Sequence, residues 1–150
     1  MSNKETGHPV LSAPKVPSAA RAESRSRRAP TGRRTYRQLL GQKAEDLAVE
    51  FLRSHGLEIL ERNFRRRLGE LDIVAREGDT LVIVEVRMRT SDRFGGAAAS
   101  VGPCKQQRLM RAAAQLLQQR SDLAQLPARF DVVVVGVRGE VEWLRHVFLT

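Results

Sequence analysis

The hydrophobic pattern of the chain predicts a β-sheet, with one helix before its first strand and another between its third and fourth strands. Apolar residues recur at helical spacing over about 38–55 and 103–120. Apolar, β-branched segments bounded by turn residues predict strands at 57–63, in a hairpin at 69–89, and at 129–137 and 140–149. The segment 129–137 (RFDVVVVGV) is apolar at nearly every position, which is typical of a central strand buried on both faces. The predicted fold class is α/β, a single mixed β-sheet flanked by helices in the order αβββαββ.

The first part of the chain has a different composition. Residues 1–36 are rich in Ser, Ala, Pro and Arg and nearly lack large apolar side chains. Such a segment cannot bury enough surface to offset the entropy of ordering, so we expect a disordered basic tail at 1–36 and one domain at 37–150. Residues 1–37 carry nine Lys or Arg against two acids, which is most of the net charge of +9. That charge suits an anionic polymer, and a merely solubilising tail would look the same.

Bulk features exclude several classes of protein. No apolar stretch approaches the roughly 20 residues of a membrane span, and no apolar segment follows the first charges as in a secretory signal. A single cysteine, Cys104, excludes an internal disulfide and fits a reducing compartment. The three histidines show no metal-ligand spacing. We therefore expect a cytoplasmic protein with no membrane partner.

The hairpin at 69–89 (GELDIVAREGDTLVIVEVRMR) carries two acids where apolar residues are expected. A two-residue loop at Gly78 and Asp79 would oppose Glu77 with Thr80. The same register opposes Asp72 with Glu85 on one face, with Cβ atoms roughly 4.5–5.5 Å apart. Acids inside an apolar strand are costly to bury unless something pairs with them.

The hairpin therefore needs a cation near the two acids. A divalent metal ion is one candidate, because Mg²⁺ takes one or two carboxylates together with water and phosphate oxygens. Arg87 is the other, since the register places it on the same face, opposite Glu70. The other face is expected to be fully apolar, with its members at Leu71, Ile73 and Ala75 against Val82, Val84 and Val86.

Other charged residues have a functional and an ordinary interpretation. Glu45 lies at the edge of the apolar stripe of the first helix, as a ligand or as a surface acid favoured by the helix dipole. Lys105, in the first turn of the second helix, opposes the dipole, so it either contacts phosphate or covers apolar surface with its stem. Arg65, Arg66 and Arg67 form a solvated turn or face a phosphate backbone. The glycine-rich stretch 90–102 is a closely approached loop or a linker.

Together these segments resemble the restriction-endonuclease-like superfamily with its PD-(D/E)xK signature. The signature would be Asp72, a spacer of twelve residues, and Glu85-Val86-Arg87. More narrowly, the chain resembles the YraN family of small bacterial proteins, which are regarded as predicted endonucleases. The matching pieces lie within about 41–148 and are GQKAEDLAVEFLRSHG, ERNFRRRLGELDIV, VEVRMR, FGGAAASV with Lys105 after it, and RFDVVVV.

The resemblance implies a restriction-endonuclease-like fold, similar to archaeal Holliday-junction resolvases, and DNA as the substrate, including branched or recombination DNA. It implies Mg²⁺ or Mn²⁺ held by Asp72, Glu85 and the Val86 carbonyl, with Glu45 joining the site. Arg87 stands where the superfamily usually has Lys, and Arg keeps its charge and cannot act as a base. Lys105 would then supply the ammonium group. The residues expected to contact nucleic acid are Arg65, Arg66, Arg67, Arg89 and Lys105.

Three hypotheses follow. The first is a metal-dependent endonuclease in which Glu45, Asp72, Glu85, Arg87 and Lys105 form the catalytic set, with a homodimer suited to paired cuts on a junction. The second is a nucleic-acid-binding module of the same fold that does not cut, with the acids in a structural ion-pair network. The third, a basic interaction protein for RNA or a membrane surface, leaves the paired acids unexplained.

Overall fold

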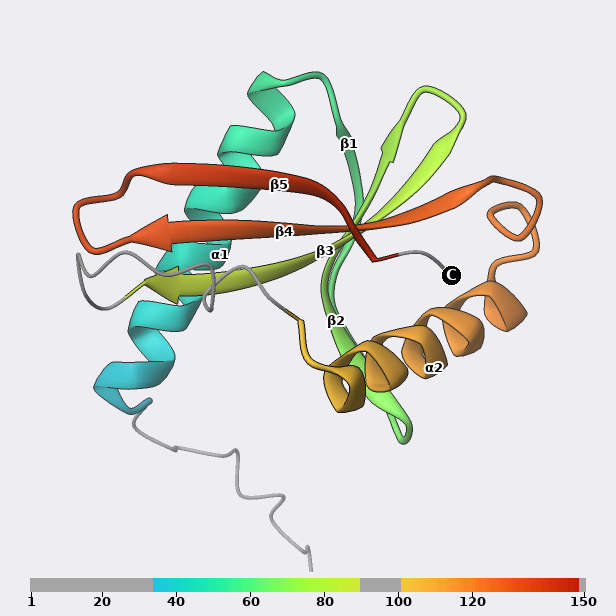
Figure 1. The fold of residues 1–150 in the computed structure, drawn as a ribbon, viewed down its shortest axis with the longest axis horizontal. Coiled ribbons are helices and arrows are strands. Elements are labelled where there is room, and N and C mark those ends of the chain that lie inside the picture. Colours follow the sequence, from blue (N-terminus) through green and yellow to red (C-terminus); the bar gives the residue numbers. More distant parts are fainter. Residues whose placement is uncertain (1–33, 90–100, 149–150) are drawn as a thin grey trace, which may run out of the picture. The chain divides into compact units, whose positions relative to one another are not determined.

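In the described residues a five-stranded sheet has one helix on each face (Figure 1). The computed structural model describes residues 34–89 and 101–148. The elements are α1 (Tyr36–Ser54), β1 (Glu58–Arg66), β2 (Gly69–Glu77), β3 (Thr80–Arg89), α2 (Pro103–Gln119), β4 (Ala128–Gly136) and β5 (Val141–Phe148). The strands lie side by side in chain order, with β3 and β4 parallel and the other neighbours antiparallel. The predicted α/β class and the order αβββαββ are confirmed.

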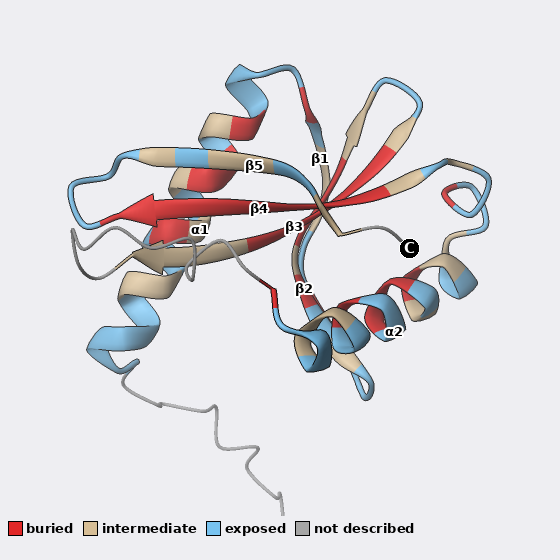
Figure 2. Ribbon diagram, in the orientation of Figure 1, coloured by how far each residue is buried: buried red, intermediate tan, exposed pale blue. Residues whose placement is uncertain are grey.

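The sheet separates two apolar cores. Strand β4 contributes to both by alternation, because Phe130, Val132 and Val134 pack on the side of α2 whereas Val133 and Val135 pack on the side of α1. Figure 2 shows β4 as buried along nearly its whole length, and the strand lies between β3 and β5. The prediction of a central strand buried on both faces is confirmed.

The helix starts follow from local chemistry. Thr35 caps α1, since its hydroxyl accepts from the Gln38 amide at 3.3 Å while the Gln38 side chain accepts from the Thr35 amide at 2.9 Å. Helix α2 begins at Pro103, whose missing amide proton costs nothing in the first turn. Both helices begin within two residues of the predicted positions.

Strand β1 differs from the sequence prediction. The pattern predicts a strand that ends at residue 63, but β1 continues through Arg66. Phe64 explains the difference, because its side chain is buried in the α2 core and keeps the chain in the sheet. The predicted tail at 1–36 lies, up to Arg33, outside the described residues, and so does most of the glycine-rich stretch 90–102. The division into tail and domain stays a prediction.

Candidate active site

The predicted site lies where β2 and β3 separate. The two strands pair in the predicted register from Glu77–Thr80 to Ile73–Val84, with Gly78 at φ +56° in the tight turn. One residue further, the Val86 amide donates to the Asp72 carboxylate at 2.8 Å. Beyond that point β2 turns toward α2 while β3 continues beside β4 (Figure 1). We call this place the fork.

The fork arises from a change of face in β1 and β2. Phe64 and Leu71 pair across the two strands and pack on the α2 side, yet Ile73, two residues from Leu71, packs on the α1 side. Residues two apart in a regular strand share a face, so the pattern slips by one position at Asn63 and Asp72. Asn63 has φ +53°, a left-handed conformation that Asn tolerates better than most residues. The prediction that Leu71 shares a face with Ile73 and Ala75 is wrong for this reason.

The two acids of the fork repel each other. Burial and the nearby charge of Glu85 raise the pKa of Asp72 from 3.8 to about 7, and the charge of Glu45 adds to this. The Val86 amide and the Lys105 ammonium favour the ionised form and partly offset the rise. The charge of Glu85 thus acts on Asp72. The β2–β3 ladder ends at Ile73–Val84, so the predicted direct pairing of Asp72 with Glu85 is not part of it.

Glu85 has one oxygen paired and one without a partner. Its side chain is 11% exposed, with Oε1 at 3.1 Å from Lys105 Nζ and at 4.0 Å from Arg87 Nε. Its Oε2 is buried and accepts no hydrogen bond from the described residues. A buried carboxylate oxygen that accepts no hydrogen bond destabilises the fold. A cation bound at this oxygen would remove that cost.

Lys105 reaches the fork from the first turn of α2. Helix α2 starts at Pro103 after Gly102 in an extended conformation, and the Gln106 side chain ties the first turn to the Val101 carbonyl at 2.7 Å. This places the Lys105 side chain, one third exposed, against Glu85. The structure therefore brings together Asp72, Glu85, Arg87 and Lys105, from two strands and one helix.

Glu45 lies beside this group and is held by another partner. The Asn63 side-chain amide donates to Glu45 Oε2 at 2.9 Å. Across residues 34–89 and 101–148, no three His, Cys, Asp or Glu side chains converge closely enough to hold a metal ion together. Two acids of the predicted set form the centre of the fork, and Glu45 acts on Asp72 through its charge.

The predicted basic residues divide into two groups. Arg65 pairs with Glu70 of β2 at 3.2 Å, whereas Arg66 donates to Gln119 of α2 at 3.0 Å, so Arg66 lies near α2. Arg67 is exposed in the turn that joins β1 to β2. Arg89 instead pairs with acids after β4, at 3.4 Å from Glu140 and 3.9 Å from Glu142. The expected facing of Glu70 and Arg87 is wrong, because the β2–β3 ladder ends before it reaches them.

A further acid, Asp131, lies inside a strand, and sequence reasoning did not identify it as buried. Asp131 of β4 is 1% exposed and accepts from Arg129 Nε at 3.1 Å, Trp143 Nε1 at 3.0 Å and the His146 amide at 3.0 Å. Arg129 also pairs with Glu77 at 2.6 Å, which lowers the pKa of that carboxyl. The sequence signal was the same as for Asp72, an acid between apolar strand residues. For Asp131, the protein itself supplies the hydrogen-bond donors.

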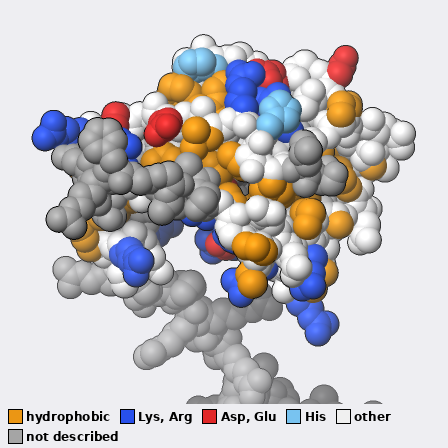
Figure 3. Space-filling model, viewed as in Figure 1, with side chains coloured by type: hydrophobic (Ala, Val, Ile, Leu, Met, Phe, Trp, Pro, Cys, Tyr) orange, Lys and Arg blue, Asp and Glu red, His pale blue; other side chains and the backbone are white. Residues whose placement is uncertain are grey.

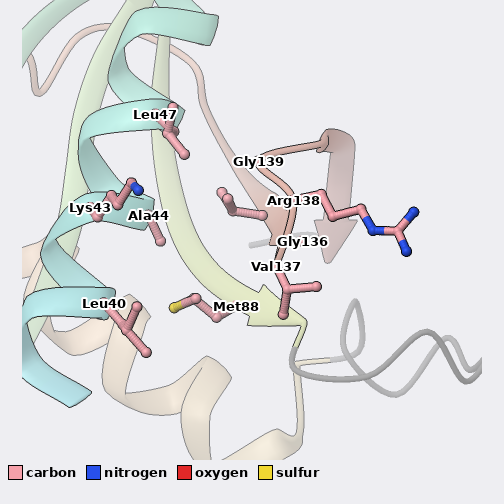
Figure 4. Close-up of a pocket in the computed structure, with 10 residues that line it drawn as sticks. Leu40, Lys43, Ala44, Leu47, Met88, Gly136, Val137, Arg138 and Gly139 are labelled. Carbon is pink, nitrogen blue, oxygen red and sulfur yellow. The ribbon is translucent and has the colours of Figure 1, made fainter. Parts of the chain in front are cut away.

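A cavity of about 340 Å³ lies elsewhere, between α1 and the ends of β3 and β4 (Figure 4). Apolar side chains such as Leu40, Leu47 and Met88 line it, with Lys43 and Arg138 among its polar residues. It contains none of the predicted catalytic residues. The fork is thus distinct from this cavity.

The raised pKa of Asp72 predicts an unusual pH dependence for the metal-free protein. Between about pH 4 and about 7 the folded protein holds a proton on Asp72 that the unfolded chain releases. The contribution of Asp72 to the free energy of unfolding should fall as the pH rises through that window, by up to about 1.4 kcal/mol per pH unit. Urea denaturation in EDTA, wild type minus Asp72→Asn, measures it. A difference that grows in favour of wild type between pH 5 and 7 contradicts the prediction.

Asn63 allows a second prediction. Asn63→Gly loses the hydrogen bond to Glu45 but tolerates the positive φ, whereas Asn63→Ala loses the bond and is strained. The alanine variant should therefore be less stable than the glycine variant by about 1 kcal/mol, the penalty for an alanine in left-handed backbone. Urea midpoints of the two variants measure the difference. Equal stabilities would mean that the backbone at Asn63 relaxes.

The fold and the fork define a class, a small α/β protein with paired acids, a lysine and an arginine where two strands of one sheet separate. The model of Uncharacterised protein family UPF0102 matches residues 44–135, and the chain belongs to this family. The YraN-family resemblance is confirmed. No helix among the described residues is long and apolar enough to cross a membrane.

Several relatives in the same family cover most of the chain. A UPF0102 protein of Nitrosomonas europaea is 50% identical over 110 residues, which are 72% of this chain and 92% of the relative. A UPF0102 protein of Janthinobacterium sp. is 49% identical over 113 residues, 75% of this chain and 89% of the relative. One of Cupriavidus necator is 52% identical over 113 residues, 74% and 83% of the two chains.

Proposed function

We propose that the protein is a metal-dependent endonuclease that acts on DNA, with its active site at the fork. The observation that carries the proposal is Glu85, a buried carboxylate with one oxygen on Lys105 and the other without a donor in the described residues, beside a second acid of raised pKa. A structural ion pair alone needs no second acid beside it.

The residues fit a divalent ion. Asp72 and Glu85 are hard oxygen ligands whose mutual repulsion a cation would relieve. Val86, whose carbonyl is the third predicted ligand, follows Glu85 in the chain and donates its amide to Asp72. Mg²⁺ or Mn²⁺ held there would activate water and stabilise charge on a phosphoryl oxygen. Glu45, which accepts a hydrogen bond from Asn63, stays a candidate for a position at the edge of the metal site.

The cations of the fork have a separate role. Lys105 and Arg87 flank Glu85 and would stabilise the negative charge that develops on the scissile phosphate. Arg87 cannot take up a proton from water, because its guanidinium stays charged at any working pH. Lys105, on the first turn of α2, supplies the compact ammonium that the motif position lacks. Branched DNA and a homodimer stay predictions drawn from the resemblance.

A second candidate function is a DNA-binding module that does not cut. Two observations favour it. Glu85 contacts Lys105 and Arg87 as an acid in an internal ion pair does, and the Asn63 side chain already donates a hydrogen bond to Glu45. In this case the acids stabilise the fork and need no metal ion.

The deciding experiment is a calorimetric titration of the full chain with Mg²⁺ and Mn²⁺, combined with cleavage of end-labelled duplex and four-way-junction DNA. We expect wild type to bind the ion and to cut only with it. Glu85→Gln should melt normally and do neither, and Lys105→Met should keep the ion but lose cleavage. Absence of ion binding by a folded wild type would overturn the endonuclease and favour the module.

A further inference from the structure

The two helices carry very different charge. Helix α1 has three acids and three Lys or Arg, and so has no net charge. Helix α2 has no acid and three cations, and its other polar side chains are mainly glutamines. Its cations are Lys105, Arg108 and Arg111. Because the two helices lie on opposite faces of the sheet, the charge separates those faces. In Figure 3 blue side chains project at the lower right, where Figure 1 places α2.

The α2 cations continue outward from the fork. Lys105, Arg108 and Arg111 follow one another at intervals of three residues, so they form a slowly turning row that advances about 4.5 Å per step. Lys105 begins the row against Glu85, and the next two are exposed. Neither Arg108 nor Arg111 has an ion pair with any residue in the described ranges. Both charges are therefore available to an outside anion.

Neighbouring groups extend the row sideways. Arg66 of β1 is exposed and donates to Gln119 of α2, so its guanidinium lies on the same side of the molecule. Exposed glutamines on α2 add neutral hydrogen-bonding groups at Gln107, Gln118 and Gln119. Cations interleaved with amides, without acids, match the charge of a phosphate backbone. We call Arg66, Lys105, Arg108 and Arg111 the α2 surface.

A close packing contact fixes this surface relative to the fork. A Cβ atom on Gly69, the first residue of β2, would lie 2.8 Å from the Arg108 carbonyl oxygen and 3.2 Å from Ala112 Cβ. Only glycine lets the strand approach the helix backbone so closely. Gly69 lies three residues before Asp72, so the strand that carries the acid is tied to the middle of α2.

We propose that the α2 surface holds the sugar–phosphate backbone of DNA and leads it from Arg111 to the carboxylates of the fork. The inference rests on the proposed function, since it names the surface through which that site receives its substrate. It assigns contacts to Arg108 and Arg111 that the motifs of the sequence did not indicate. The α1 face, with its balanced charge, lies away from the bound strand.

The test is the salt dependence of DNA binding by the full chain. A labelled duplex is titrated in EDTA by fluorescence anisotropy over a series of KCl concentrations. Each phosphate contact contributes about 0.9 to the slope of log K against log salt. Arg108→Gln/Arg111→Gln should therefore lower the slope by about 1.8. The matched control, Arg37→Gln/Lys43→Gln on α1, removes the same charge from exposed positions and should leave the slope near wild type.

Each outcome decides the inference. Equal losses in both double variants would show that only total charge matters, and no loss in either would assign binding to the basic tail; both results overturn it. Thermal melts of all proteins show whether the variants fold. Failure of the proposed function is separate. If wild type cuts nothing but the α2 variant still loses slope, the surface stands without the nuclease, whereas cleavage with unchanged slopes leaves the nuclease without the surface.

Discussion

Asp72→Asn is expected to stabilise the metal-free protein and at the same time to abolish divalent-ion binding and cleavage. The substitution keeps an oxygen that accepts the Val86 amide at 2.8 Å and removes the charge that faces Glu85. The pKa of about 7 corresponds to a cost of at most about 4 kcal/mol for ionised Asp72. We expect on the order of 2 kcal/mol to be recovered above pH 7 in EDTA.

The gain and the loss are measured together. Urea denaturation in EDTA gives the stability, and calorimetry with Mn²⁺ gives ion binding. Asp72→Ala is the control, because it removes the same charge but also leaves the Val86 amide without its acceptor, so it should be less stable than Asp72→Asn. An asparagine variant less stable than wild type at pH 8 would show that Asp72 is a structural partner of the fork cations.

The other large effect is expected at Asp131→Ala, which should lower the free energy of unfolding by about 3–5 kcal/mol. The buried carboxylate neutralises Arg129 and accepts from Trp143 and from the His146 amide. Its loss leaves a guanidinium that is 8% exposed with Glu77 as its remaining ion pair. Urea denaturation with tryptophan fluorescence measures the change, since Trp143 is the one tryptophan of the chain.

Two controls separate this effect from general loss of charge. Asp131→Asn keeps an acceptor and should be intermediate. Asp122→Ala removes an exposed acid that pairs with Arg120 at 2.8 Å and should leave the midpoint nearly unchanged, because exposed ion pairs contribute little. Ion binding at the fork should survive in all three folded variants. An Asp131→Ala protein as stable as wild type would contradict the importance of this network.

Asp72 and Asp131 gave the same signal in the sequence, an acid between apolar strand residues, and only their surroundings distinguish them. Asp131 is surrounded by donors from its own strand and from β5. Asp72 faces another acid and one amide. Apolar neighbours in a strand show that an acid is buried, but its partners come from other strands and helices. The difference between a structural acid and a candidate catalytic one is therefore a tertiary property.

The sequence by itself determined the features that depend on neighbours along the chain. The tight turn at Gly78 and Asp79 and the alternation beside it set the hairpin register, which the structure follows from Glu77–Thr80 to Ile73–Val84. The continuous β-branched sequence of β4 identified the central strand in the same way. Helical periodicity and Pro103 located α2.

Only the tertiary structure decided what meets at the fork. The left-handed backbone at Asn63 and the end of the β2–β3 ladder moved Leu71 to the other face and separated Glu70 from Arg87. The packing of α2 on Gly69 brought Lys105 to Glu85 and aligned Arg108 beyond it. Such contacts join residues distant in sequence, and they depend on strand twist and helix packing, which periodicity along the chain does not encode.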